Sequence, residues 1–212
     1  VKGLYRPFTK QWIYFNRRFN EMVYQMPRIF PGGDYKNLVI MTTAIGSRNG
    51  FSCLMSDSLV DLNSMEAGAQ CFPMYLYDED GAPSEDSQDE LFNTNKSGLV
   101  RREAITDVGL SHFRAAYPFD TISKEDIFYY IYGILHSNDY REKFSDNLSK
   151  ELPRIPCVKN YADFQAFSIA GRRLSELHIK YEFVDKYPLQ IVGGDALLNH
   201  SDYLVDKMKN PK

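Results

Sequence analysis

The chain has 212 residues, 43% of them hydrophobic, which is enough to bury the core of one domain or slightly more. Its net charge of −3 excludes a global basic field, so any contact with nucleic acid or anionic lipid must come from a local patch. Its three cysteines are widely spaced. They favour neither a disulfide framework nor a zinc site and suit a reduced, cytoplasmic setting. No apolar run approaches the ~18 residues of a membrane span, and no signal peptide is recognisable.

Residues 1–77 are predicted to be rich in short strands. The apolar run 38–43 indicates a buried strand, and residues 51–55 indicate a second one. Between them, Asn49 and Gly50 tolerate the positive φ of a tight turn, so the two strands are expected to form a hairpin. Weaker strand signals lie at 10–16, 59–62 and 71–77. Residues 17–30 are ambiguous between a short helix and irregular chain, and residues 31–34 are predicted to form a turn.

The segment from 78 to 103 is predicted to be an acidic, flexible loop. Its first thirteen residues, 78–90, hold seven acidic side chains and no basic one, so they have little apolar surface to bury. A regulatory acidic arm or a mimic of DNA is the functional alternative to a plain solvated loop.

Helices are predicted from 104 to 182. Residues 104–117 form an amphipathic pattern that ends before a proline. Ser123 and Asp126 have the spacing of a capping box at the start of the next helix. A fresh N-cap at 137–139 opens a further helix, prolines close it by residue 156, and a last helix spans 163–181. Strands followed by helices favour an α+β fold of mostly antiparallel strands, with residues 183–212 as the start of further structure.

No catalytic motif is recognisable in the chain. The phosphate-binding loop GxxxxGK[ST], the dinucleotide fingerprint GxGxxG, the zinc motif HExxH and the nucleophile elbow GxSxG are all missing. The four histidines lie far apart in the sequence on predicted helices, where such residues are more often structural than catalytic. We therefore expect neither an enzyme nor a cofactor or metal site within this chain.

Three blocks of sequence carry a resemblance to a known family. They are Tyr5-Arg6-Pro7-Phe8 with the segment 11–31, then Gln70 to Tyr75, and lastly Lys124 to Val158 with its continuation through 163–167 to Leu177-His178. In order and length these blocks resemble the C-terminal specificity region of the bacterial Type ISP restriction–modification enzymes, which are often catalogued as predicted helicases.

The resemblance implies that the chain is a fragment of a larger enzyme, as does its beginning at Val1 rather than methionine. The parent would combine a nuclease, an ATP-driven DNA translocase, an adenine N6-methyltransferase and a target-recognition domain. S-adenosylmethionine, ATP and Mg are then expected in upstream domains. The implied partners of this fragment are double-stranded DNA and the neighbouring methyltransferase and translocase domains, with no membrane contact.

A target-recognition domain must hold phosphates through Lys and Arg and read base edges, where Arg suits guanine and Asn or Gln suits adenine. The predicted hairpin turn presents Arg48 and Asn49, one residue of each reading type. The other candidate DNA-binding residues are Lys36, Asn37, Lys96, Arg101 and Arg102.

Two alternatives stay open. The chain could be a structural module whose aromatic helices, from 104 to 181, dock on the methyltransferase or translocase without reading bases. It could also be an independent enzyme if the fold gathers its histidines with carboxylates in a pocket. A basic concave face near Arg48 would favour DNA reading, whereas a broad Tyr/Phe patch over the helices would favour docking.

Overall fold

The computed structural model describes residues 1–16, 18–79, 98–185 and 188. The chain divides into two compact units, Val1–Glu182 and Phe183–Lys212. The described residues of the second unit are 183–185 and 188, so most of the further structure predicted from residue 183 onward lies outside the described residues, as do residues 80–97. None of the described helices is long and apolar enough to cross a membrane.

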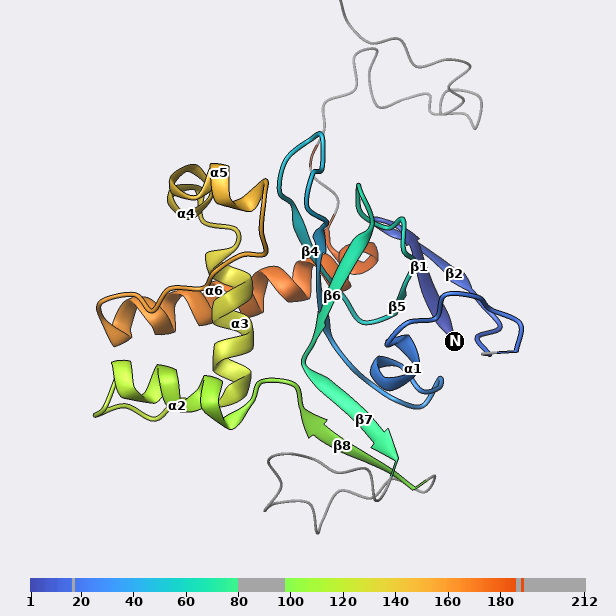
Figure 1. Cartoon of the computed structure of the whole chain (residues 1–212), viewed down its shortest axis with the longest axis horizontal. Helices are drawn as coiled ribbons and strands as arrows, with labels where there is room; N and C mark the ends of the chain where they lie inside the picture. Colours follow the sequence, from blue (N-terminus) through green and yellow to red (C-terminus); the bar gives the residue numbers. More distant parts are fainter. Residues whose placement is uncertain (17, 80–97, 186–187, 189–212) are drawn as a thin grey trace, which may run out of the picture. The chain divides into compact units, whose positions relative to one another are not determined.

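The N-terminal half of the first unit contains three small sheets (Figure 1). Their strands pair in the orders β2-β1-β5, β4-β3-β6 and β7-β8, and every pairing is antiparallel except that of β1 with β5. The strands are β1 (Lys2–Arg6), β2 (Thr9–Trp12), β3 (Val39–Thr43), β4 (Cys53–Ser56), β5 (Leu59–Val60), β6 (Ala69–Pro73), β7 (Tyr75–Glu79) and β8 (Leu99–Glu103), and one short helix, α1 (Met26–Ile29), precedes β3.

The C-terminal half of the unit is helical, so the predicted α+β class is confirmed. The elements are α2 (Asp107–Ala116), α3 (Lys124–Ile134), α4 (Asn138–Lys143), α5 (Ser145–Leu148), α6 (Tyr161–Ile179) and the 3₁₀ turn η2 (Tyr181–Phe183). The predicted capping box at Ser123 forms, because its side chain accepts from the Asp126 N–H while Asp126 accepts from the Ser123 backbone. The helix expected after Ser137 is broken into α4 and α5 at Phe144, whose backbone leaves the helical conformation.

The predicted loop from 78 to 103 is shorter than expected at both ends. Asp78 belongs to β7, and the residues Leu99–Glu103 form β8, which pairs with β7 from Tyr75↔Glu103 to Glu79↔Leu99. Val100 on β8 is buried, so this strand contributes apolar surface to the fold despite its acidic neighbours in the sequence. The two strands form a separate ribbon beside the helices (Figure 1).

Strand β3 is buried on both faces, which explains why its sequence shows no polar alternation. Ile40 faces the larger hydrophobic cluster, which contains most of the helical core residues. Val39 and Met41 face a second cluster formed with β1, β5 and α1. Strand β3 therefore contributes side chains to both hydrophobic clusters.

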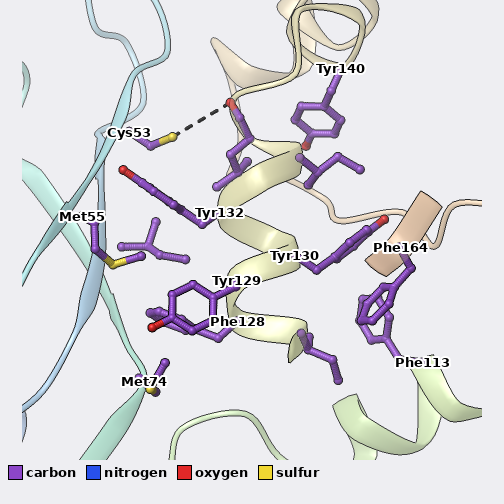
Figure 2. Packing of buried hydrophobic residues seen from close by; sticks show 14 of the residues in the cluster. Cys53, Met55, Met74, Phe113, Phe128, Tyr129, Tyr130, Tyr132, Tyr140 and Phe164 are labelled. Carbon is purple, nitrogen blue, oxygen red and sulfur yellow. Dashed lines mark hydrogen bonds between the residues drawn. The ribbon is translucent and has the colours of Figure 1, made fainter. Parts of the chain in front are cut away.

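Helix α3 is the centre of the larger cluster. Figure 2 shows Tyr132 and Met55 on the side of α3 that faces the sheet, and Tyr130 on the side that faces Phe113 and Phe164. The ring of Tyr130 stacks on Phe164 of α6 with 4.7 Å between centroids. Helices α3 and α6 cross where Gly133 meets Gly171, because no side chain separates their backbones there.

Three tyrosines of the helical half are core residues whose hydroxyl groups are hydrogen-bonded. The hydroxyls of Tyr117, Tyr130 and Tyr140 donate to the backbone carbonyls of Val158, Pro156 and Arg154 in the extended exit of the predicted helix pair. Burial raises the pKa of Tyr130 above its ordinary value, so the hydroxyl keeps the proton that it donates. These side chains hold the extended segment against α3 and leave little aromatic surface for a partner.

Candidate nucleic-acid interface

The structure divides the predicted DNA-binding residues between the two ends of β3. Lys36 precedes this strand and Arg48 follows it, and a strand of five residues spans about 17 Å. In Figure 1 the loop that joins β3 to β4 lies at the end of the sheet away from β7 and β8. The candidates therefore do not form one site.

The hairpin turn that carries Arg48 and Asn49 is held in place by the carboxylate of Glu66. Glu66 accepts hydrogen bonds from the Ser47 hydroxyl at 2.8 Å and the Asn49 backbone N–H at 3.0 Å. Gly46 and Gly50 adopt φ values of +83° and +80°, a conformation that favours glycine. The predicted hairpin is thus confirmed, and the Arg48 and Asn49 side chains are both exposed on it.

The Glu66 carboxylate is ionised under ordinary conditions. The hydrogen bond from Ser47, together with the backbone N–H of Asn49, holds the pKa of Glu66 below its ordinary value of 4.5. A charged acceptor makes stronger hydrogen bonds than a neutral one. The turn is consequently ordered before any ligand binds, and less conformational entropy is lost when its side chains make contacts.

Asn37 is engaged within the fold, and its role as a DNA contact stays a prediction. Its side chain is only 5% exposed. The amide nitrogen donates to the carbonyls of Ile29 and Tyr75 at 2.9 and 2.8 Å, and the amide oxygen accepts from the backbone N–H groups of Leu38 and Tyr75 at 2.8 and 3.1 Å. All four hydrogen-bonding positions of the amide are occupied. Asn37 therefore joins α1 and β7 to the start of β3.

Arg102 is also engaged within the fold. Its Nε lies 2.5 Å from Asp78 Oδ2, while Arg28 Nη2 lies 2.5 Å from the other carboxylate oxygen. Burial opposes ionisation of Asp78, but the hydrogen bonds from Arg102 and Arg28 outweigh it and lower the pKa of this carboxyl. Asp78 thus compensates part of the charge of both arginines. Lys96, the remaining loop candidate, lies outside the described residues.

Lys36 and Arg101 meet at a hollow of about 550 Å³, which we call the basic groove. Lys2 and Trp12, from β1 and β2, also line it, although the sequence did not single them out. The other lining residues are Val1, Phe30, Gly32, Gly33, Tyr35, Asn37, Leu38, Asp57, Ser58, Leu59, Met74, Tyr75 and Ile179. The groove joins strands from two different sheets, β2-β1-β5 and β7-β8, so it could not be recognised from spacing along the chain.

Two cations of the basic groove lie over aromatic rings. The Arg101 guanidinium is 4.3 Å from the centroid of Tyr75, and Lys2 Nζ is 5.5 Å from the centroid of Trp12. Such pairs are attracted by the quadrupole of the ring. The sequence feature that could have indicated the groove is the cluster of Trp, Tyr and Phe near the N-terminus, which is interleaved with Lys and Arg.

Exposed aromatic side chains are concentrated near the N-terminus and not on the helices. Within residues 5–24 the structure exposes the aromatic side chains of Tyr5, Phe8, Trp12, Tyr14, Phe19 and Tyr24. On the helices, most of the Tyr and Phe side chains belong to the larger hydrophobic cluster. A broad Tyr/Phe docking patch over the helices, as the structural alternative expected, is therefore not present in the described part of the chain.

Two histidines of the fold lie together beside Tyr132. His136 and His178 lie side by side with 5.7 Å between ring centroids, and both contact Tyr132. Burial lowers the pKa of each, so both rings are neutral at physiological pH. Among the residues that the structure describes, no three His, Cys, Asp or Glu side chains are placed to hold a metal ion.

Comparisons with known proteins agree on one family. The sequence model of the Type ISP C-terminal specificity domain matches residues 1–212. A cryo-EM structure of a DrdV–DNA complex is similar over 90% of this chain, with 39% identity and a TM-score of 0.74. No curated protein matches the chain.

Two solved Type ISP restriction–modification enzymes are also similar. LlaGI, as a nuclease-deletion mutant in complex with a DNA substrate mimic, has 31% identity and a TM-score of 0.67 over 88% of this chain. The ATP-dependent LlaBIII, bound to DNA, has 31% identity and a TM-score of 0.70 over 87%. The chain spans only 17%, 14% and 11% of the DrdV, LlaGI and LlaBIII chains. The resemblance seen in the sequence is confirmed, and the chain belongs to the family of Type ISP C-terminal specificity domains.

Proposed function

We propose that the chain is the DNA target-recognition domain of a single-chain restriction–modification enzyme. The observation that carries this proposal is the match of the whole chain to a specificity domain whose three solved relatives, at 31–39% identity, are complexes with DNA or a DNA mimic. The basic groove and the ordered Arg48 turn give this function a physical basis despite the net charge of −3.

The two ends of β3 have different tasks in this proposal. Arg48 and Asn49 are exposed on an ordered turn, so they can enter a groove of the duplex and hydrogen-bond to base edges. Lys2, Lys36 and Arg101 at the other end supply phosphate contacts, which position the duplex without reading it. Arg102 adds less to either task because Asp78 compensates its charge.

The remaining activities belong to other parts of the parent enzyme. We assign adenine N6-methylation and ATP-dependent cleavage to upstream domains, which would bind S-adenosylmethionine, ATP and Mg. The similarity to LlaGI, which was solved as a nuclease-deletion mutant, and to the ATP-dependent LlaBIII supports this assignment. The three free cysteines fit a reduced cytoplasmic setting.

A docking module is the second candidate function. It is favoured by the exposed aromatic side chains at 5–24 and by an apolar hollow of about 500 Å³ between α3 and the outer edge of β6. Docking on the methyltransferase or translocase is compatible with DNA reading, because these surfaces do not include the Arg48 turn.

The test uses the full-length parent enzyme with the double substitution Arg48→Ala and Asn49→Ala. The matched control is Asn147→Ala with Arg154→Ala, which removes the same two side-chain types from exposed positions on the helical half. We expect the Arg48 variant to discriminate its target from other duplexes about 10- to 100-fold less well, since each bidentate base contact contributes ~1–3 kcal/mol. If the two double variants discriminate equally well, the turn does not read bases. If the full-length enzyme prefers no duplex over any other, the proposed function is contradicted.

A further inference from the structure

The basic groove is hollow, which distinguishes it from an ordinary phosphate-binding surface. A volume of about 550 Å³ lies within the range of small-molecule sites. The backbone of a duplex is convex and contacts side chains at a rim, so it leaves such a hollow unfilled. A ligand that occupies it must be smaller than a duplex and able to enter between the strands that line it.

The walls of the groove favour a flat ring. Trp12 is 80% exposed, and its indole is one of four aromatic side chains of the lining, together with Tyr35, Tyr75 and the buried Phe30. Exposed aromatic side chains and Arg guanidinium planes are the surfaces on which unpaired bases stack. Arg101 lies over Tyr75, so a guanidinium and an aromatic ring adjoin on this part of the wall.

The charge of the groove favours an anion beside that ring. Lys2, Lys36 and Arg101 line it, and among the described residues none of the three pairs with a carboxylate. Asp57 is the acidic residue of the lining, and its charge is partly compensated by Lys10, whose Nζ is 3.8 Å from Asp57 Oδ1. The hollow is therefore net positive in a protein that is net negative.

We propose that the basic groove binds one unstacked nucleotide of the bound DNA. The base lies against the Trp12 and Tyr75 side of the hollow, and Lys36 and Arg101 contact the adjoining phosphates. This inference rests on the proposed function, because the nucleotide belongs to the DNA that the domain recognises. It adds a site for an unpaired base within the specificity domain, at the opposite end of β3 from the Arg48 turn.

Photocrosslinking on the full-length enzyme tests this site. Thymines around the target are replaced one at a time by 5-iododeoxyuridine, the duplex is irradiated in the complex, and adducts are mapped by mass spectrometry. We expect one position to crosslink to Trp12 or Tyr75. Trp12→Ala should abolish an adduct at residue 12 and weaken duplex binding by ~5- to 150-fold, the range for losing one stacked base, whereas Trp12→Phe should restore most of the affinity.

The matched control is Tyr14→Ala, because Tyr14 is 74% exposed and does not line the groove. This variant should retain both the adduct and the affinity. If no position crosslinks to a groove residue in a complex that still prefers the target duplex, the inference is overturned while the proposed function stands. If the wild-type enzyme shows no preference for any duplex, the proposed function fails independently of the groove variants.

Discussion

The crossing of α3 and α6 makes a sharp prediction about Gly171. A Cβ added there would lie 2.0 Å from the Tyr129 carbonyl oxygen, and real Cβ atoms essentially never come closer than 3.0 Å to such an atom. The obstacle is backbone, so Gly171→Ala must move the two helices apart by about 1 Å. A gap of that size removes a quarter to a half of the dispersion energy of the contacts around it.

We expect Gly171→Ala to destabilise the fold by about 3 kcal/mol, at the upper end of the ordinary cost of overpacking. For a domain of this size that corresponds to a melting temperature lower by roughly 6–12 °C. The matched control is Gly109→Ala in α2, where an added Cβ meets only side-chain atoms at 3.4 and 3.6 Å and should change stability by less than about 1 kcal/mol. Thermal unfolding followed by circular dichroism measures both variants. Equal melting temperatures would refute the close backbone approach at this crossing.

Three further predictions concern buried and hydrogen-bonded groups. Asn37→Ala should cost about 3 kcal/mol, because it leaves buried backbone groups without partners, whereas the exposed Asn138→Ala should melt like the wild type. The lowered pKa of Glu66 means that its contribution to the turn is complete above its ordinary value of 4.5 and is lost as pH falls through the lowered pKa. The protection of the Asn49 amide, measured as its intrinsic exchange rate divided by the observed rate at the same pH, should therefore fall in acid, and an equal fall in Glu66→Gln would contradict this cause. Burial raises the pKa of Cys53 and Cys71 to about 12, so an alkylating reagent at pH 8 should modify Cys157 first. If the fast phase of alkylation survives in Cys157→Ser, this order of reactivity is contradicted.

Local signals in the sequence predicted what local interactions determine. The capping box at Ser123 and the N-cap at Ser137 depend on residues three positions apart, and both form. The hairpin that joins β3 to β4 forms too, but its connection, residues 44–52, is longer than a tight Asn-Gly turn, and its positive φ values are those of Gly46 and Gly50. The family resemblance added the function, which none of these signals could indicate.

Long-range interactions account for what could not be predicted. Strand β8 exists because Leu99–Glu103 pairs with β7 across about 20 intervening residues, and the acidic composition between them indicates only a loop. Asn37 looks like a surface residue in the sequence, but its amide supplies hydrogen bonds that α1 and β7 need. The basic groove brings Lys2 next to Arg101, so no spacing rule could have joined them.

The separation of charge explains how an acidic chain can belong to a DNA-reading family. The acidic segment 78–90 contributes seven negative charges to a net charge of −3, so the rest of the chain is net positive. The exposed cations Lys2, Lys36 and Arg101 gather at one hollow, where the local potential matters more than the total charge. Binding to DNA should accordingly weaken with salt in proportion to the few phosphates contacted there.

Exchange of the specificity domain between two full-length Type ISP enzymes tests the central claim most directly. Residues 1–212 would replace the matching region of a relative with a different target, and the methylated sites would be read by methylome sequencing of cells that carry the chimera. If the chain is the target-recognition domain, methylation moves to the sequence recognised by its own parent. Methylation that stays at the site of the recipient enzyme would contradict the account.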